Sequence, residues 1–248
     1  MLKTRLIPIL TFNGISLVKT KQFSQMRTVG NPIQAARVYN SRNVDELVFV
    51  DIKASEQKRE MNLSLVKKVI DECFMPVTIG GGIKTQENIQ NLLRIGADKV
   101  LIKSKAISNP KFIADAVEYF GSQCISIAVD VIQNDNKYFI HHNSEKQILF
   151  EDFIQEMDGI GVGEMLINAV HRDGMMEGFD TELYLQAQKK ANCPIVAVGG
   201  AGNPSHFTDL MRINFNGGLG GASIFHFTQF TPQDVKIALK QNNFSVRI

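Results

Sequence analysis

The segment Val77–Gly82, with the sequence VTIGGG, returns 119 residues later as Val196–Ala201, with the sequence VAVGGA. The same spacing relates the apolar run at residues 6–10 to the run at residues 125–129. A duplication of this kind predicts a fold assembled from two similar halves, each with a glycine-rich turn after a strand.

The two halves differ at one position that matters for chemistry. Asp130 follows the second of the two apolar runs, whereas the matching residue after the first run is Thr11. A pair of carboxylates can serve as acid and base, but a threonine hydroxyl cannot take the place of one near neutral pH. We therefore expect the chain to keep the fold built from the two halves but not to carry out a reaction that needs both carboxylates.

Eight short runs rich in apolar and β-branched residues are spread along the chain. They are residues 6–10, 46–50, 76–79, 99–103, 124–129, 164–169, 195–198 and 218–222. Several are apolar without alternation, which is typical of parallel strands buried on both faces.

Amphipathic stretches separate these runs, and some carry helix-start signals such as Thr85 and Pro110. The expected helices are residues 62–70, 87–93, 111–119, 150–157, 180–191, 205–211 and 232–240. Repeated βα units favour parallel pairing, and eight of them predict a closed (β/α)8 barrel, the TIM barrel fold. We expect one barrel domain over residues 1–248, with half-barrels at about 1–120 and 121–248.

Composition excludes several classes of function. With 27 Lys and Arg against 25 Asp and Glu, the net charge is +2, so we expect neither a nucleic-acid partner nor a membrane partner. The apolar runs are too short to span a bilayer. Three widely spaced cysteines suggest buried thiols in a reducing cytoplasm rather than a disulfide framework or zinc site, and we expect no metal and no cofactor.

Two segments depart from the alternation of predicted strands and helices. Residues 13–31 form a long polar stretch after the first strand, which we predict to be a loop at the mouth of the barrel. Residues 132–147 hold an apolar run between polar clusters and predict a β-hairpin after the fifth strand.

Glycines and serines recur in register at the ends of strands. Glycine lets the backbone approach an anion closely, and a following helix offers free N–H groups for phosphate. The two sets therefore predict two phosphate sites on opposite sides of the mouth and a small ligand with a phosphate at each end, although the glycines could simply make tight turns. The candidate phosphate-binding residues are Gly81, Gly82, Lys103 and Ser104, with Gly199, Gly200, Gly221, Ala222 and Ser223.

Other polar residues also follow strands. Asp130 is the candidate general acid or base, with helix capping or a hydrogen bond within a loop as the alternative. The candidate substrate-binding residues are Lys19, Asp51, Asn168, Asp173 and Gly174, of which the two aspartates could instead be helix caps and Lys19 a solvated surface residue.

Four charged residues stand at the starts of strands: Arg5, Glu46, Lys99 and Glu164. Side-chain direction repeats every two residues along a strand, so they could point inward together as a ring of salt bridges. Spacing alone favours the alternative, four unrelated surface charges at the stability face of a barrel.

At this point the chain resembles the cyclase subunit of imidazole glycerol phosphate synthase, an enzyme family of histidine biosynthesis, over essentially its whole length. The stretches that carry the resemblance are DELVFVDIKAS (Asp45–Ser55), IGGGI (Ile79–Ile83), GADKV (Gly96–Val100), FGSQ (Phe120–Gln123), RDGMMEGFD (Arg172–Asp180), VGGAG (Val198–Gly202) and ASIFHF (Ala222–Phe227).

The resemblance implies a lyase or cyclase barrel and a glutaminase subunit docked on its floor as a heterodimer. The glutaminase supplies ammonia, which passes through the barrel to a substrate with two phosphates. The four floor charges match the family's ammonia gate, and Asp98 matches a position at the glutaminase interface. The candidate phosphate-site glycines also match family positions, and so do Ser104, Ser223, Lys19, Asp51, Asp130 and Asp173.

The departures from the family pattern lie at the mouth. Thr11 replaces the family's first catalytic aspartate, Lys103 replaces an asparagine, and Val198 replaces a serine. Asn168 stands where a threonine is expected.

The charged residues at the strand starts match the family, whereas several residues at the mouth do not. Two hypotheses follow. The first is a working cyclase of histidine biosynthesis, with Asp130 as its main acid or base. The second, which the mouth favours, is a paralogue that delivers ammonia for acetamidino-sugar synthesis in a surface-polysaccharide pathway, with a separate amidinating synthetase.

Overall fold

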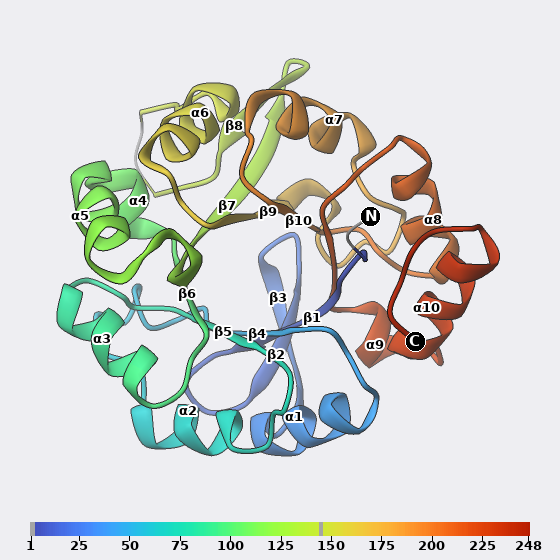
Figure 1. Cartoon of the computed structure of the whole chain (residues 1–248), viewed down its shortest axis with the longest axis horizontal. Coiled ribbons are helices and arrows are strands. Elements are labelled where there is room, and N and C mark those ends of the chain that lie inside the picture. The colour runs from blue at the N-terminus through green and yellow to red at the C-terminus, as the bar shows by residue number, and fades with distance from the viewer. Residues whose placement is uncertain (1–2, 144–145) are drawn as a thin grey trace.

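The eight expected strands form one closed parallel barrel in the computed structural model, which describes residues 3–143 and 146–248 (Figure 1). The barrel strands are β1 (Leu6–Phe12), β4 (Leu47–Asp51), β5 (Val77–Gly80), β6 (Lys99–Ile102), β7 (Ile125–Asn134), β9 (Glu164–Ala169), β10 (Ile195–Val198) and β11 (Gly218–Gly221). Each pairs with its neighbour in that order, and β11 returns to β1 through Leu6 and Leu219. The TIM barrel predicted from the sequence is confirmed.

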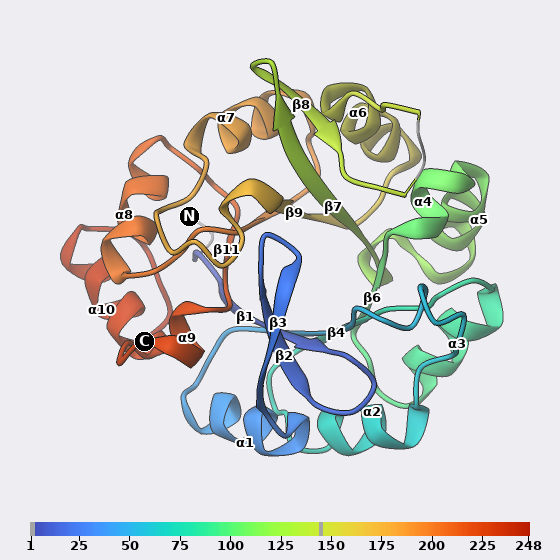
Figure 2. The ribbon, with the colours of Figure 1, turned by 180° about the vertical axis from the view of Figure 1, so that it is seen from behind.

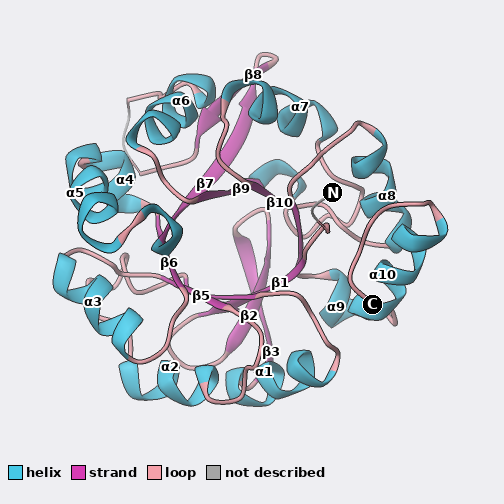
Figure 3. Ribbon diagram, in the orientation of Figure 1, coloured by secondary structure: helices cyan, strands magenta, loops and turns pink. Residues whose placement is uncertain are grey.

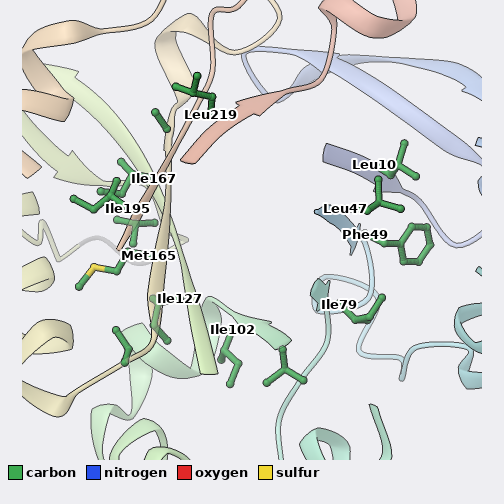
Figure 4. Packing of buried hydrophobic residues seen from close by; sticks show 14 of the residues in the cluster. Leu10, Leu47, Phe49, Ile79, Ile102, Ile127, Met165, Ile167, Ile195 and Leu219 are labelled. Atoms are coloured by element: carbon green, nitrogen blue, oxygen red, sulfur yellow. The ribbon is translucent and has the colours of Figure 1, made fainter. Parts of the chain in front are cut away.

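Alternating side chains divide the core into two shells. Leu6 and Leu10 of β1 point outward into a large cluster between strands and helices, part of which is drawn in Figure 4. Ile7 and Ile9 point inward into a second cluster with Val48 and other residues of the barrel lumen. Because both faces of each strand are buried, the strands read as nearly continuous apolar runs.

Helices surround the barrel on the outside (Figure 3). They are α1 (Pro32–Ser41), α2 (Leu63–Ile70), α3 (Gln86–Arg94), α4 (Ser104–Ser108), α5 (Pro110–Phe120), α6 (Phe150–Ile160), α7 (Thr181–Lys190), α8 (Pro204–Arg212), α9 (Ile224–Phe227) and α10 (Pro232–Gln241). The expected start signals work as such, because Thr85 forms a capping box at α3 and Pro110 is the first residue of α5. In the described part of the chain, no helix is long and apolar enough to cross a membrane.

Three helices were missing from the sequence prediction. Helix α1 begins at Pro32, and the Asn31 side chain caps it by accepting from Ile33 N and Gln34 N. Its buried face is small, with Ala36 and Tyr39, so the apolar periodicity is weak. Helices α4 and α9 have five and four residues, too few to show a period.

The prediction of a loop at residues 13–31 was wrong. This segment is an antiparallel hairpin of β2 (Leu17–Lys21) and β3 (Ser24–Gly30). Most of β3 is exposed, so it lacks the alternation of apolar and polar residues by which a strand is recognised. The second predicted hairpin is present, because β7 continues to Asn134 and pairs with β8 (Lys137–Ile140); residues 144–145 of that prediction lie outside the described part.

Secondary structure recurs at the spacing of the sequence repeat. Strand β6 begins at Lys99 and β11 at Gly218, 119 residues later, and the short helices α4 and α9 follow these two strands. This recurrence supports the two-half organisation, which stays a proposal.

Candidate functional site

The carboxyl ends of the barrel strands form the mouth of the barrel, where three of the candidate residues meet. Lys103 Nζ, just after β6, lies 2.5 Å from Asp130 Oδ2 on β7. Asn168 of β9 donates from Nδ2 to Asp130 Oδ1 at 3.4 Å. Both oxygens of the candidate acid or base are therefore engaged, one of them by a cation.

Thr11 stands near the end of β1, where its partly buried hydroxyl donates to the backbone carbonyl of Val18 on β2. The proton of the hydroxyl is thus used to hold the hairpin against β1. A threonine so placed ties two strands together and supplies no acid.

Two glycine turns follow β5 and β10, and both need glycine. Gly81 has φ 116°, and a Cβ there would lie 2.3 Å from the backbone oxygen of Asp51. Gly200 has φ 101°, and a Cβ there would lie 2.1 Å from the backbone oxygen of Gly178. No larger residue fits at either turn, so the glycines are explained in part by close backbone contact.

Residues of the two predicted phosphate sets line two different depressions. One depression brings residues of the second set beside the loop after β9; it is lined by Asp173, Gly174, Gly199, Gly200, Ala201, Gly220, Ala222 and Ser223. Gly221 ends β11 at its edge. Gly81 and Gly82 line a different depression with residues of α2 and α3, and neither Lys103 nor Ser104 is part of it. The second side has the position expected of a phosphate site, after the last strands of a barrel.

Asp51 ends β4, and both of its carboxylate oxygens accept hydrogen bonds from residues of the following loop. Arg59 binds it in a bidentate pair, with distances of 2.6 Å and 2.8 Å to the two carboxylate oxygens. The backbone N–H groups of Lys53 and Ala54 donate to the same carboxylate at 3.2 Å. Asp51 is 2% exposed and shapes the loop after β4.

Lys19 is buried in β2 rather than solvated in a loop. Its ammonium donates to the backbone oxygen of Ile9 at 2.6 Å, and the residue is 4% exposed. Burial lowers the pKa of Lys19 to about 8, and the nearby charge of Asp173 opposes that shift only in part. Burial likewise raises the pKa of Asp173 to about 6, against the attraction of Lys19. An anion placed between them and the second glycine turn would favour charged Lys19.

The β2–β3 hairpin lies across the mouth, in front of the strands in Figure 2. At its tip, Gln22 donates from its backbone N–H to Asp173 O and from Nε2 to His171 O, each at 2.9 Å. The Phe23 ring meets His141 edge-on at 5.6 Å and lies 5.9 Å from the Lys103 ammonium. The tip therefore contacts the segments after β6, β8 and β9.

The residues of this turn do not suit its backbone. Gln22 and Phe23 have φ values of 51° and 60°, a left-handed region that favours glycine, asparagine and aspartate. The β7–β8 turn has the same geometry with Asp135 and Asn136, which do suit it. Strain of this kind persists where other contacts hold the segment in place, often at functional sites, and the contacts of Gln22 and Phe23 with the mouth have that role.

At the other end of the barrel, which we call the floor, Arg5, Glu46, Lys99 and Glu164 form a closed ring of salt bridges. Arg5 lies 2.6 Å from Glu46 and 2.6 Å from Glu164. Lys99 lies 3.0 Å and 3.1 Å from the same two carboxylates. Each charge has two partners of opposite sign, and this floor ring closes the amino-terminal end of the lumen.

Asp98 lies beside the floor ring in sequence and is exposed. Its Oδ2 accepts from the backbone N–H of Val77 at 2.8 Å, which fixes the start of β5. The fully open side chain of Phe74, 93% exposed, belongs to the connection before the same strand. The floor near β5 thus offers both a carboxylate and an apolar side chain.

A family model described as histidine biosynthesis protein matches residues 5–231. The chain belongs to this family. The resemblance inferred from the sequence is therefore confirmed.

Its relatives are full-length homologues of HisF. The imidazole glycerol phosphate synthase subunit HisF of Staphylococcus saprophyticus is 40% identical over 253 residues, which cover 100% of both chains. The Staphylococcus aureus subunit of the same name is 38% identical, also over 100% of both chains. A Campylobacter jejuni protein provisionally named imidazole glycerol phosphate synthase subunit hisF2 is 40% identical over 251 residues and 100% of both chains.

Sequence reasoning missed Arg59, Gln22 and Phe23 in this HisF homologue. Arg59 lies eight residues beyond the aspartate it binds, and no periodicity marks it. The Gln-Phe pair could have been noticed only once a hairpin was assigned, because the signal is the lack of ordinary turn residues at that point.

The shifted pKa of Lys19 predicts how stability depends on pH. Since the folded pKa is about 8 and the unfolded value is near 10.5, the unfolded chain holds an extra proton between these values. The contribution of Lys19 to stability therefore rises as pH increases through this window, by up to about 3 kcal/mol. We expect the free energy of unfolding of Lys19→Met to exceed that of wild type by the largest amount at pH 7. This difference should become smaller towards pH 10.

Urea unfolding of both proteins at several pH values measures this difference. Lys21→Met, which removes a lysine from the exposed end of the same strand, is the matched control. A Lys19→Met difference that stays constant between pH 7 and pH 10 would contradict the shifted pKa.

Proposed function

We propose that the chain is the barrel subunit of a glutamine-dependent synthase of the HisF type. A glutaminase docks on the floor, and its ammonia passes the floor ring, moves along the lumen and leaves at the mouth. The observation that carries the proposal is the contrast between the two ends. The floor ring is complete, whereas at the mouth Asp130 of β7 is paired with Lys103 and the matching residue of β1 is Thr11 rather than a second carboxylate.

The pathway that we propose is a paralogous one, the amidination of a surface sugar by a separate synthetase. A general acid or base typically contributes about 10²–10⁴-fold to a rate. The Thr11 hydroxyl is hydrogen-bonded to Val18 O, and Asp130 is ion-paired with Lys103. The barrel therefore lacks the pair of free carboxylates that cyclisation would use. The role that remains for such a barrel is to deliver ammonia.

The alternative is a working cyclase of histidine biosynthesis. Its support is the depression at Gly199, Gly200 and Ser223, which suits one phosphate of a diphosphorylated substrate, together with the names of the HisF relatives. Under this alternative, Asp130 acts after Lys103 moves to a phosphate of the ligand.

One assay separates the two. The purified chain is supplied with excess ammonium salt and the phosphoribulosyl-formimino carboxamide nucleotide of histidine biosynthesis, so that no glutaminase is needed. Absence of turnover, with a known HisF as positive control, supports the ammonia-delivery role. Turnover comparable with that HisF would overturn it in favour of the cyclase.

The floor ring gives a prediction about coupling. Glu164→Ala leaves Arg5 and Lys99 bound only to Glu46, so the ring opens on one side. We expect the complex with the glutaminase to hydrolyse glutamine while losing most of the transfer of nitrogen to product, with added ammonium restoring product. The ratio of glutamate to product measures this, and a ratio equal to that of wild type would remove the ring from the ammonia path.

Asp98 gives a prediction about docking. Asp98→Asn keeps an oxygen that can accept from Val77 N but removes the charge. We expect the affinity for the glutaminase to fall by about fivefold to tenfold, the size of a single interfacial charge effect of about 1 kcal/mol. Calorimetry measures it. Asp209→Asn on α8, an exposed helix residue, serves as the control. Equal affinity for Asp98→Asn and wild type would place the docking surface elsewhere.

A further inference from the structure

Strand β3 presents a free edge at the mouth of the barrel. Among residues 3–143 and 146–248, which the structure describes, β3 is the last strand of the sheet and pairs with β2 alone. On its other side, its main-chain groups have no main-chain partner in that part of the chain. The side chains from Ser24 to Thr28 are all exposed. A free edge of this length can pair with a strand of another protein.

The second hairpin of the same barrel shows how such an edge is closed. The outer side of β8 is covered by the residues before α6, because Ile140 N donates to Ile148 O at 2.9 Å and Phe139 forms a bridge with Leu149. No segment within the described ranges covers β3 in this way. Native proteins cover, shorten or charge their exposed edges, so the open edge of β3 indicates a partner.

The β2–β3 hairpin carries positive charge and no negative charge. Residues 13–31 contain Lys19, Lys21 and Arg27 but neither aspartate nor glutamate. Lys21 and Arg27 are exposed, and neither forms an ion pair with a residue that the structure describes. Met26, 41% exposed, adds apolar surface next to Arg27. A strand that complements β3 therefore combines acidic and apolar side chains.

The same charge argues against a second copy of this chain as the partner. Arg27 is the middle residue of β3, which runs from Ser24 to Gly30. Two copies that paired over the whole of β3 in antiparallel fashion would set Arg27 directly opposite Arg27. Like charges at directly opposite positions destabilise a pair of strands. The edge is therefore suited to a different chain, with an acidic residue opposite Arg27.

We propose that the free edge of β3 is the docking strand for the ammonia-accepting synthetase, which adds an acidic extended segment to this sheet. This inference rests on the proposed function, in which ammonia leaves at the mouth. The hairpin lies across that mouth (Figure 2), so a chain paired with β3 is held where ammonia emerges. Docking there matters because an amine that reaches neutral water is mostly protonated, and ammonium has no lone pair with which to attack an acceptor.

The test uses the purified chain and a synthetic peptide as the probe. The probe has blocked ends, the length of β3, and alternating valine and glutamate residues. One control peptide carries lysine in place of glutamate, and another carries N-methyl groups on its backbone amides. Fluorescence anisotropy measures the affinity, and hydrogen–deuterium exchange locates the peptide on the chain. We expect the glutamate peptide alone to bind and to slow exchange in residues 24–30.

Charge reversal on the chain connects binding to this edge. Arg27→Glu should weaken binding of the glutamate peptide by about fivefold or more, because an attractive cross-strand pair becomes a repulsive one, and should let the lysine peptide bind. Lys137→Glu makes the same change at the exposed start of β8, whose edge is covered, and should keep the affinity of wild type. Both variants change an exposed side chain, and circular dichroism and the Tm show that each is folded.

Equal affinity of the glutamate peptide for wild type and Arg27→Glu would overturn the proposal, as would equal binding of the N-methylated peptide. Absence of binding, or slowed exchange only outside residues 24–30, would do the same. A wild-type dimer that protects residues 24–30 without any peptide would assign the edge to a second copy and overturn it as well. No glutaminase, ammonia or acceptor is present, so failure here removes the docking strand and leaves the proposed function to the turnover and coupling assays.

Discussion

The double variant Thr11→Asp, Lys103→Asn is expected to gain cyclase activity over wild type by about 10²–10⁴-fold when it is assayed with ammonium and the histidine-pathway substrate. The first change supplies a second carboxyl group at the mouth, and the second frees Asp130 from its 2.5 Å ion pair. Neither change alone provides two unpaired carboxylates, so each single variant should gain much less.

The position of Thr11 favours this outcome. Its hydroxyl faces the backbone oxygen of Val18, and an aspartate there would meet that oxygen as a hydrogen-bond donor only in its protonated form. A hydrogen bond to the neutral form raises the pKa of a carboxyl group, which suits a general acid. The aspartate would thus be held as an acid while Asp130 serves as the base.

Thr11→Asn, Lys103→Asn is the matched control, because asparagine has nearly the shape of aspartate but transfers no proton. We expect it to stay at the wild-type level, with a Tm close to that of the aspartate variant. Equal activities of the two double variants would show that the missing carboxylate does not limit the reaction. No activity in any variant would place the block in substrate binding, at the depression around Gly199 and Ser223.

The barrel itself could be read from the sequence with good accuracy. Strands β9 and β10 have the predicted bounds, residues 164–169 and 195–198. Their residues are all buried, so an unbroken apolar run is the direct result of packing on both faces. Helix starts were equally clear where a side chain caps the backbone, as Thr85 does.

The hairpin across the mouth could not be read in the same way. Its second strand is held by main-chain pairing with β2, and its side chains from Ser24 to Thr28 are exposed. Such pairing leaves little pattern in the sequence, because the backbone bonds do not depend on which side chain is present. The strained turn at Gln22 and Phe23 makes the segment resemble a turn even less.

In the candidate site, the positions of the residues could be predicted from the sequence, but their contacts with one another could not. Strand ends located Asp130, Asn168 and Lys103 at the mouth, but their mutual pairing depends on side-chain length and on barrel stagger. Spacing also placed the four floor charges at strand starts without showing that they meet. A ring across four strands requires distances that only the closed barrel supplies.

The second large effect concerns stability and comes from the buried ion pair of Lys236 and Asp45. Lys236 of α10 is 1% exposed, and its ammonium lies 2.8 Å from Asn43 O and 3.2 Å from Asp45 Oδ1. The other carboxylate oxygen of Asp45 accepts from Leu6 N at 2.8 Å. One carboxylate therefore connects the last helix to the start of β1.

We expect Asp45→Ala to lower the free energy of unfolding by about 3–5 kcal/mol, because it leaves the buried Lys236 ammonium without a counter-charge. For a chain of this size that corresponds to a Tm lower by about 6–20 °C. Asp209→Ala breaks an exposed pair with Arg212 at 2.6 Å and should cost less than about 1 kcal/mol. Urea and thermal unfolding measure both.

Removing the charge of the partner as well should recover part of the loss. Asp45→Asn, Lys236→Met keeps an acceptor for Leu6 N and buries no charge, so we expect it to be more stable than Asp45→Ala. A loss below about 1 kcal/mol in Asp45→Ala would mean that water reaches Lys236 in solution. Because Asp45 and Leu6 adjoin Glu46 and Arg5 in the chain, the same pair also positions half of the floor ring. We therefore expect Asp45→Ala to raise the ratio of glutamate to product even at temperatures where the variant remains folded.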